Sequence, residues 1–419
     1  MMGKAYDWAE PGCLFTNRFR NYNLMEYCDD YQIITCNPCG EQPLPKYAAC
    51  NLGSINLSEF VVNSFEDNAY FDTLDFIQAV KVAIRGLDTV LDENLENHAL
   101  PEQRKMAENY RNVGLGVMGM HDMLIKLGMK YGSHESIKFV DGLMDLMFRN
   151  AVVESSILAK EKGAFPAYNK NLLKSKILKE HFTDGEISNF DKYGLRNCSL
   201  LSIAPTGSLG TMLNVSTGCE PLFALYYNRK TESLNGNTEK TYEVYTGVAK
   251  EYVDKNENKL PNSLPDYFIT SADISWKDRI DMQSVLQNHI DTAISSTVNL
   301  PNNISQEEIE QLYLYAWEKG LKGVTIFRDG CKRAGILTTD TSKKSNDSIE
   351  SSSPNNELKR GMIIKADDNC IGKKRTLVTG CGTLHCEAFF DPDTGELLET
   401  YLSKGSTGGC NNFMVGLSR

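Results

Sequence analysis

Most of what this chain does can be inferred from one segment, Asn37-Pro38-Cys39-Gly40-Glu41, and from the run Cys50-Asn51-Leu52-Gly53-Ser54-Ile55-Asn56-Leu57 that follows it. Pro38 and Gly40 exclude a regular helix or a central strand. The apolar residues 31–36 just before the segment predict a short buried strand. A loop after such a strand presents its polar side chains at a tip, where Asn, Cys and Glu can converge on one ligand. The alternative is a turn with two buried cysteines, because free cysteine is usually a small core residue.

Composition limits the class of protein. The 419 residues, 41% of them hydrophobic and 24% charged, are typical of a globular chain with a large core and a second domain. The net charge of −11 argues against non-specific binding to nucleic acid. No apolar run is long enough to span a bilayer, and residues 1–6 lack the apolar core of a signal peptide. Twelve cysteines without an export signal favour a cytoplasmic protein that keeps its thiols for chemistry or metal.

Three regions follow one another along the chain. Residues 1–337 alternate helical patterns with short apolar runs, which predicts an α/β domain. Residues 338–358 are rich in Ser, Thr, Asn, Asp and Lys, and predict a disordered linker. Residues 359–419 form a small cysteine-containing domain, in which runs of β-forming residues on both sides of an Asp/Gly turn predict a β-hairpin.

Within the first region, several elements have clear local signals. Helices are predicted over residues 75–87 and 137–160 from the spacing of their apolar residues. A third helix begins at Ser305, whose capping box with Glu308 fixes its start, and it ends at Gly320. The next apolar run, residues 324–327, predicts a barrel strand.

The segment from Asn37 to Glu41 resembles the active-site finger loop of ribonucleotide reductases, and the resemblance covers essentially the whole chain outside the linker. It implies the C-terminal part of the ten-stranded α/β barrel of that family, with a small β-rich C-terminal domain. By the same resemblance, Cys39 carries a thiyl radical that abstracts the substrate's 3′ hydrogen, and Glu41 takes the proton of the 3′ hydroxyl. Asn37 holds the ribose hydroxyls. Cys50 is one of the two thiols that supply the reducing electrons.

A second motif, Pro205-Thr206-Gly207-Ser208, follows an apolar strand. Its small residues can open a helix with bare backbone N–H groups, which suit a phosphate. It resembles the substrate-phosphate loop of the reductases, and residues 216–223 after it also match the family. Cys219 stands where the family usually has an aliphatic residue, so we interpret it as a core residue.

The resemblance also indicates the source of the radical. Reductases fed by a separate radical subunit have two adjacent tyrosines near the last matching strand, and Ile326-Phe327 stands there in this chain. This difference, with the short spacing from Cys39 to Cys50, is typical of the branch that uses adenosylcobalamin. The implied activity is that of an adenosylcobalamin-dependent ribonucleoside-diphosphate reductase, which makes 2′-deoxyribonucleotides for DNA synthesis. It implies a nucleoside di- or triphosphate substrate, a thioredoxin-like or dithiol reductant, and a homo-oligomer, without membrane or nucleic-acid partners.

Other residues leave alternatives open. Cys381, Cys386 and Cys410, with Cys370 or His385, can form a zinc site, relay electrons to the active-site disulfide, or simply be buried. The six histidines are scattered without metal-ligand spacing, so we expect His121 and His289 to be satisfied surface or core residues. The glycines of residues 112–119 do not make a dinucleotide site, because the strand and the acidic partner that such a site needs are missing.

The resemblance begins in the middle of the family's barrel. We therefore expect that the N-terminal half of the reductase, with the partner of Cys50, is a separate requirement and that this chain alone is inactive. A glycyl-radical-type reductase is one alternative, but no glycyl segment is found near residue 419. A non-catalytic nucleotide-binding remnant is another, although it should have lost Cys39 or Glu41, and both are present.

Overall fold

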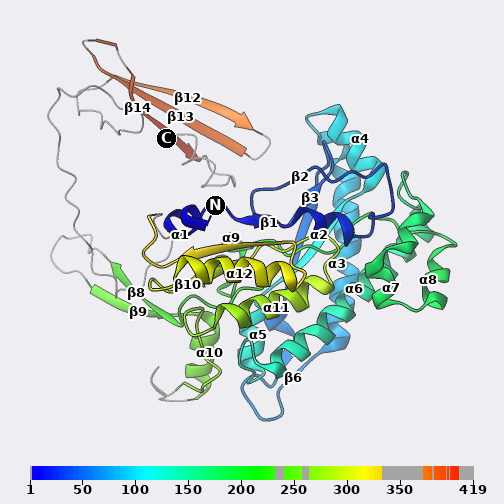
Figure 1. Cartoon of the computed structure of the whole chain (residues 1–419), viewed down its shortest axis with the longest axis horizontal. Helices are drawn as coiled ribbons and strands as arrows, with labels where there is room; N and C mark the ends of the chain where they lie inside the picture. Colours follow the sequence, from blue (N-terminus) through cyan, green and yellow to red (C-terminus); the bar gives the residue numbers. More distant parts are fainter. Residues whose placement is uncertain are drawn as a thin grey trace. The chain divides into compact units, whose positions relative to one another are not determined.

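The computed structural model describes residues 2–231, 240–256, 264–332, 371–379, 382–392, 394–395 and 397–404. The chain divides into two compact units, Met1–Ser342 and Lys343–Arg419, which are described separately here (Figure 1). The predicted linker, residues 338–358, lies outside the described residues. The boundary between the units, after Ser342, falls within that predicted segment.

A run of parallel segments forms the centre of the first unit. Strand β4 (Asn51–Asn56) pairs with β7 (Val113–Met118), and Leu115 of β7 bridges to Leu201 in the next segment. Further along that segment, Ile203 bridges to Ile294. Since all these pairings are parallel, the residues that follow each strand meet at the same edge.

The run continues through β10 (Thr297–Leu300), which pairs in parallel with β11 (Gly323–Arg328). Strand β1 (Cys13–Leu14) adds to β11 in the antiparallel direction. Strand β11 confirms the strand predicted over residues 324–327. The strands do not close into a barrel within the part of the chain that the structure describes, so the α/β architecture there is an open portion of one.

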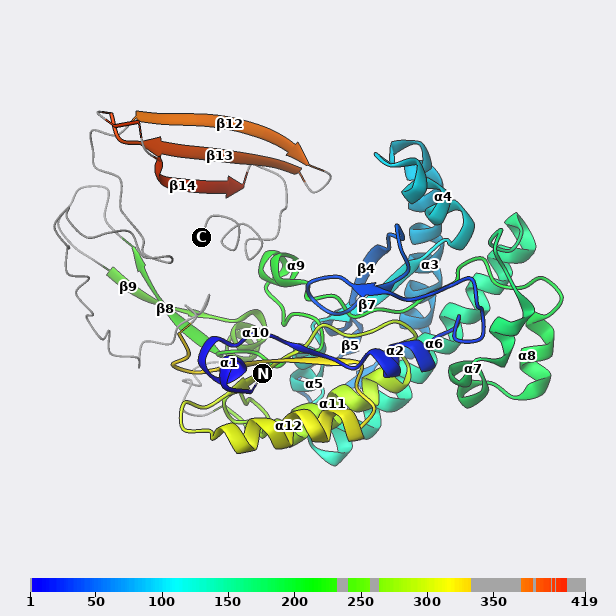
Figure 2. The same cartoon turned by 45° about the horizontal axis from the view of Figure 1, so that its top comes forward.

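Long helices cover these strands (Figure 2). Helix α3 (Thr73–Asn94) and helix α6 (His134–Lys162) contain the two helices predicted over residues 75–87 and 137–160, and both extend beyond the predicted ends. Helix α12 (Gln306–Glu318) begins with the predicted capping box between Ser305 and Glu308. Helix α11 (Trp276–Asn288) packs against α6 and α12.

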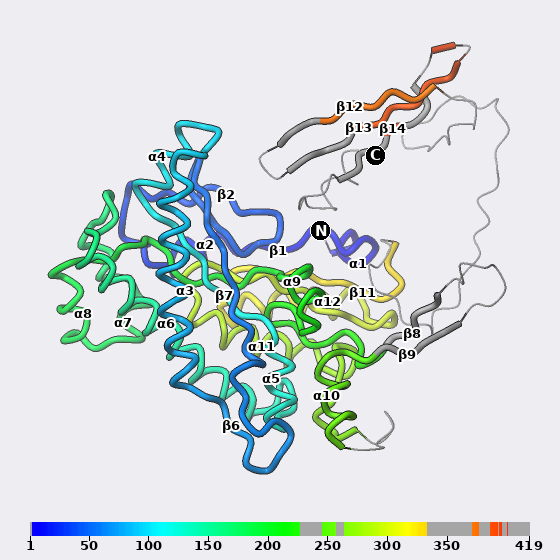
Figure 3. Tube along the Cα trace, turned by 180° about the vertical axis from the view of Figure 1, so that it is seen from behind, coloured from blue at the N-terminus to red at the C-terminus, as the bar shows by residue number. Residues whose placement is uncertain are grey.

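The remaining elements of the first unit are short (Figure 3). They are α1 (Met2–Trp8), α2 (Thr16–Asn21), β2 (Thr35–Cys36), β3 (Pro43–Leu44), η1 (Leu57–Phe60), β5 (Val61–Val62), β6 (Tyr70–Phe71), η2 (Leu95–Asn97), α4 (Pro101–Tyr110), α5 (Met120–Lys126), η3 (Lys170–Lys174), α7 (Lys176–His181), α8 (Asp184–Phe190), α9 (Gly207–Leu213), β8 (Tyr226–Thr231), β9 (Lys240–Tyr245) and α10 (Gly247–Lys255). Within the described ranges, no helix combines the length and the apolar character that crossing a membrane requires.

The glycine-rich residues 112–119 form the most buried strand of the unit. Every residue of β7 is buried, and its two glycines permit a close approach of the neighbouring segment. A Cβ at Gly116 would lie 2.3 Å from the backbone oxygen of Ser202, and one at Gly114 would lie 2.8 Å from the Ser202 Cβ. These glycines therefore serve packing, in agreement with the rejection of a dinucleotide site.

The second unit contains an antiparallel sheet of β12 (Ile371–Thr379), β13 (Gly382–Phe390) and β14 (Leu397–Lys404). Strands β13 and β14 are consecutive and paired, which confirms the predicted hairpin, and Gly395 in the turn has the positive φ of 71° that favours glycine. Strand β12 completes the sheet on the other edge of β13.

Candidate active site

A small hairpin presents the predicted catalytic motif. Strands β2 and β3 pair antiparallel, and the finger loop, residues 37–42, connects them. The loop closes on itself, since the backbone N–H of Gly40 donates to the carbonyl of Asn37 at 3.1 Å and the N–H of Asn37 donates to Gln42 at 3.2 Å. Gly40 has a φ of 87°, which explains the glycine. The strand predicted over residues 31–36 is limited to Thr35–Cys36, although Tyr31 and Ile33 are buried as expected.

Backbone contacts fix the loop against the parallel strands. The carbonyl oxygen of Glu41 accepts the N–H of Ala293 at 3.2 Å and the hydroxyl of Ser202 at 3.0 Å. Ser202 and Ala293 belong to neighbouring segments of the central run, so the loop spans two strands. The base of the finger loop is therefore held by the same segment that leads, three residues later, to Pro205.

Glu41 combines a buried side chain with a carboxylate oxygen that lacks a hydrogen-bond partner. Its side chain is buried, and its Oε2 atom has no hydrogen-bond partner in the described protein. Burial raises the pKa of Glu41, while the Asn37 side chain, in hydrogen-bond contact, opposes the rise. Asn37 also accepts the backbone N–H of Gln42 at 2.9 Å through its Oδ1 atom. A carboxylate with a raised pKa and one bare oxygen is suited to general-base chemistry near neutral pH.

The two predicted catalytic thiols lie in different environments. Cys39 is exposed at the tip of the loop. Cys50 is half-buried just before β4, and burial raises its pKa well above the ordinary value, with further contributions from the charges of Asp291 and Glu41. The electrostatic effect of Glu41 on Cys50 places these two side chains in one neighbourhood.

The residues around Cys50 include three that the sequence did not single out. Cys198 is buried near Cys50 and in hydrogen-bond contact with the hydroxyl of Tyr31, and burial raises the pKa of Tyr31. The Asn112 side chain donates to the Tyr31 hydroxyl at 2.6 Å.

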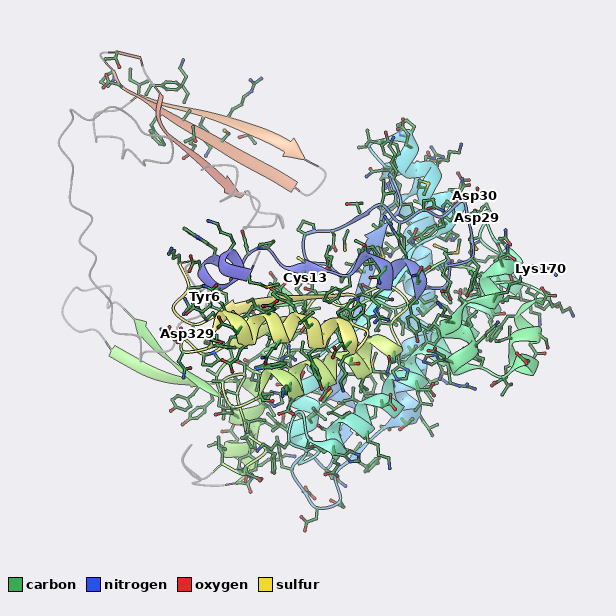
Figure 4. The ribbon with its side chains drawn as sticks, viewed as in Figure 1. Tyr6, Cys13, Asp29, Asp30, Lys170 and Asp329 are labelled. Carbon is green, nitrogen blue, oxygen red and sulfur yellow. The ribbon has the colours of Figure 1, made fainter. Side chains whose placement is uncertain are left out.

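The segment that leads to this hairpin carries two acidic residues, Asp29 and Asp30 (Figure 4). Burial is the main cause that raises the pKa of Cys28 to about 11, and the charges of Asp29 and Asp30 add to it. Burial therefore disfavours the thiolate forms of Cys28 and Cys50.

The predicted phosphate loop connects the central segment to α9. Pro205, Gly207 and Ser208 are exposed, and Thr206 has the left-handed φ of 49°. The Thr206 hydroxyl accepts the backbone N–H of Gly218 at 2.8 Å, which ties the loop to the following motif. A Cβ at Gly207 would meet no atom within 4 Å. The backbone of the loop is thus not covered at Gly207, and the first N–H groups of α9 have no acceptor inside the helix.

A buried charge beside the site was also missed from the sequence. Lys322 donates to the backbone carbonyls of Ile290, Asp291 and Thr292. The carboxylate of Asp291 accepts the N–H groups of Leu200 and Leu201, at 2.9 and 2.6 Å. These bonds join the segments that hold the finger loop. No local sequence pattern predicts them, because the partners are about 30 or more residues apart.

The other residues named from the sequence are placed as follows. Cys219 is fully buried in the main core, as predicted. His121 accepts the N–H of Leu222 at 2.9 Å through Nδ1. Of the tail cysteines, Cys386 lies on β13, whereas Cys381 and Cys410 lie outside the described residues, so the zinc site and the electron relay remain predictions. His289 is buried and both of its ring nitrogens have close partners, as expected; one partner is His181, a contact that the sequence spacing does not indicate.

Comparisons with known proteins agree with this arrangement. Residues 1–327 match the family model described as ribonucleotide reductase, barrel domain. The chain is 30% identical, over 92% of its length and 48% of the relative's, to a vitamin B12-dependent ribonucleoside-diphosphate reductase of Thermoplasma acidophilum. It is 31% identical, over 81% of its length and 47% of the relative's, to a protein of the same name from Mycobacterium tuberculosis.

Less similar proteins widen the comparison. A ribonucleoside-diphosphate reductase subunit alpha of Chlamydia pneumoniae is 29% identical over 78% of this chain and 34% of its own length. The class Id ribonucleotide reductase alpha subunit of Actinobacillus ureae shares the fold, with a TM-score of 0.60 and 21% identity over 79% of this chain and 60% of its own. The chain spans about half the length of the first two relatives. Because the barrel-domain model covers most of the first unit, the chain belongs to the ribonucleotide reductase family.

Proposed function

We propose that this chain carries the substrate-facing part of an enzyme that reduces ribonucleotides to 2′-deoxyribonucleotides. One observation carries the proposal: the finger loop combines an exposed Cys39 with a buried Glu41 whose Oε2 atom lacks a partner. The two roles need opposite environments. The thiol must be exposed to meet a cofactor, and the carboxylate must be buried to have the raised pKa of a proton acceptor. Family membership and the names of the relatives support the same reaction.

In this proposal the residues act in sequence. The Cys39 sulfur, as a thiyl radical, removes the 3′ hydrogen atom of the ribose, while Glu41 accepts the proton of the 3′ hydroxyl. Asn37 holds the ribose hydroxyls. Cys50 and a partner thiol supply two electrons and two protons, so that the 2′ hydroxyl leaves as water and a disulfide forms. Cys39 then returns the hydrogen atom to the 3′ carbon, which restores its radical, and Glu41 returns its proton to the 3′ oxygen. A thioredoxin-like or other dithiol reductant restores the pair.

The exposed side of the loop fits a cofactor that reaches Cys39 from outside. Beside Pro38 lies an open pocket of about 620 Å³, lined by Lys4, Trp8, Glu10, Pro11 and Gly12. Adenosylcobalamin, when bound, would supply the radical equivalent that Cys39 uses. The vitamin B12 dependence in the names of two relatives supports this choice, as does Ile326-Phe327 in place of a tyrosine pair.

The substrate is a nucleoside di- or triphosphate, with its phosphates at residues 205–208. Gly207→Ala tests this placement, because the added methyl group meets open space in the protein but occupies the room of a phosphate. Equilibrium dialysis with a ribonucleoside diphosphate should show affinity reduced at least about tenfold, with an unchanged melting temperature. Gly185→Ala in α8, where a Cβ has its nearest neighbour at 4.0 Å, is the matched control. Equal affinity of the Gly207→Ala variant and the wild type would remove the phosphate assignment.

The activity itself is measured on the assembly purified from the source cells through a tag on this chain. With adenosylcobalamin, a dithiol and a labelled ribonucleotide, it should form deoxyribonucleotide. The Cys331→Ala variant, which removes a thiol outside the hairpin, should remain active. An assembly that binds ribonucleotide but gives no deoxyribonucleotide would overturn the proposed reaction and favour a nucleotide-binding protein.

A further inference from the structure

A cluster of metal-binding side chains lies on helices of the first unit, apart from the finger loop. His181 is the last residue of α7, and His289 caps the C-terminal end of α11. Asp141 and Asp145 stand one turn apart on α6, which packs against α11. Figure 1 shows α7 beside α6. Three elements that are distant in the sequence thus bring two imidazoles and two carboxylates together.

The hydrogen bonds of the two imidazole rings leave a specific problem. His181 Nδ1 lies 2.7 Å from the carbonyl oxygen of Ile177, and His289 Nε2 lies 2.8 Å from Asp141 Oδ1. A carbonyl and an ionised carboxylate only accept, so both of these ring nitrogens carry hydrogen. The remaining nitrogens, His181 Nε2 and His289 Nδ1, face each other at 2.7 Å. If both rings were neutral, the lone pairs of these two nitrogens would point at each other and repel. An electrophile must therefore lie between the two nitrogens.

We propose that this electrophile is a divalent transition-metal ion of the Zn²⁺ class, bound by His181 Nε2, His289 Nδ1 and a carboxylate oxygen of Asp145. One ligand atom from each of these residues lies within 4.8 Å of the others. Bonds to Zn²⁺ of about 2.0–2.2 Å in tetrahedral geometry separate ligand atoms by a little more than 3 Å, so small side-chain rotations suffice. Imidazole and carboxylate donors suit such ions better than Mg²⁺ or Ca²⁺.

The surroundings of the cluster match those of metal-bound histidines. Such histidines donate their second N–H to a carbonyl or a carboxylate, which fixes the ring. Ile177 and Asp141 provide these two acceptors. Arg149, which donates to the His181 carbonyl, is paired with Glu186, so its charge is already engaged.

An entry path and a structural role are both evident. The imidazole side chains are 5% and 9% exposed, whereas those of Asp145 and Asp141 are 40% and 56% exposed, so one side of the cluster opens to solvent. A bound ion would join the end of α7 to α6 and α11. It would therefore fix the helical excursion of residues 163–198 to the helices that cover the central strands. The competing occupant is a proton shared by the two rings.

The test is titration of the full chain with Zn²⁺ and, as a spectroscopic probe, Co²⁺. Wild-type protein should bind one equivalent whose Co²⁺ spectrum lacks the near-ultraviolet thiolate band that any cysteine site would give. His181→Ala should abolish this binding. Asp145→Asn should weaken it at least about tenfold, and Asp141→Asn about 10–100-fold, because Asp141 only orients the ring. His134→Ala, which removes an exposed histidine at the start of α6, should bind as the wild type does.

Variants at less buried positions keep the test decisive if a substitution of a buried histidine prevents folding. If His181→Ala does not fold, the decision rests on Asp145→Asn, whose side chain is 40% exposed. Zn²⁺ should raise the melting temperature of the wild type and of His134→Ala, and much less that of Asp145→Asn. Binding that is absent, or equally tight in wild type and Asp145→Asn, would overturn the metal site and leave a shared proton between the rings.

Discussion

The hydroxyl of Ser202 donates a 3.0 Å hydrogen bond to the backbone carbonyl of Glu41. This contact joins the strand segment that leads to the phosphate loop with the loop that carries the proposed general base. The position of the Glu41 carboxylate therefore depends on a side chain that touches neither the thiols nor the phosphate loop.

Ser202→Ala should reduce turnover by about tenfold while the protein still folds. Loss of one buried hydrogen bond costs about 1 kcal/mol of unfolding free energy, and the Ala293 N–H still holds the Glu41 carbonyl. Steady-state kinetics should show the loss mainly in kcat, because the proposed phosphate contacts at residues 205–208 do not involve Glu41. Ser188→Ala, which removes an exposed hydroxyl that donates to Gly185, serves as the control. Unchanged kcat in Ser202→Ala would mean that the backbone contacts alone position Glu41.

Glu41→Gln keeps the shape of the side chain but removes the proton acceptor, so kcat should fall by about a hundred- to ten-thousand-fold. The wild-type rate should decline as the pH falls through the raised pKa of Glu41, above the ordinary value of 4.5, and this acid limb should be absent in the variant. Substrate affinity should change little. A variant with near-native kcat and poor binding would make Glu41 a substrate clamp.

Thermal unfolding of the same variant gives a separate test. A raised pKa means that folded Glu41 holds its proton more tightly than unfolded Glu41, so its contribution to stability is present below pH 4.5 and lost as the pH rises through the folded pKa. Glu41→Gln should therefore melt higher than the wild type at pH 7. The difference should shrink as the pH approaches 4.5. A variant that melts lower at pH 7 would show that the ionised carboxylate is stabilised by its surroundings.

Substitution of Cys39 and substitution of Cys50 should have different effects on the reaction. Cys39→Ala should abolish substrate turnover, because the sulfur that carries the radical is gone. Cys50→Ser should still permit removal of the 3′ hydrogen, but without the reducing thiol the substrate should lose its base and the enzyme should inactivate. Release of free base is measured beside deoxyribonucleotide formation. Normal multi-turnover product from either variant would refute the corresponding role.

Lys322→Met should destabilise the first unit by about 3 kcal/mol or more, since it leaves three buried carbonyls without their donor and the Asp291 charge without a cation. Urea unfolding measures this loss. Lys319→Met removes a largely exposed lysine that pairs with Asp281, and should cost no more than about 1 kcal/mol. Similar losses for the two variants would show that Lys322 is not essential to the packing of these segments.

The parts that sequence predicts well are those with local signals. Ser305 and Glu308 form their capping box within one turn, and the Asp/Gly turn of the second unit lies between the strands it joins. The chemistry of the finger loop could likewise be predicted from its residue types. The hydrogen bond from Ser202 that holds the loop could not be predicted, because Ser202 lies 161 residues from Glu41. His181 and His289, 108 residues apart, meet only because α7 returns to α11, which no spacing rule detects.

The bond from the Ala293 N–H to the Glu41 carbonyl joins two main-chain atoms, so nearly any amino acid at either position can make it. Natural variation at residue 293 would then leave the reactive geometry intact, and a scan of alanine or other side-chain replacements would miss the contact altogether. Proline alone lacks the donor. At this contact, the location of the finger loop is therefore determined by the backbone path at residues 41 and 293 and not by the side chains there.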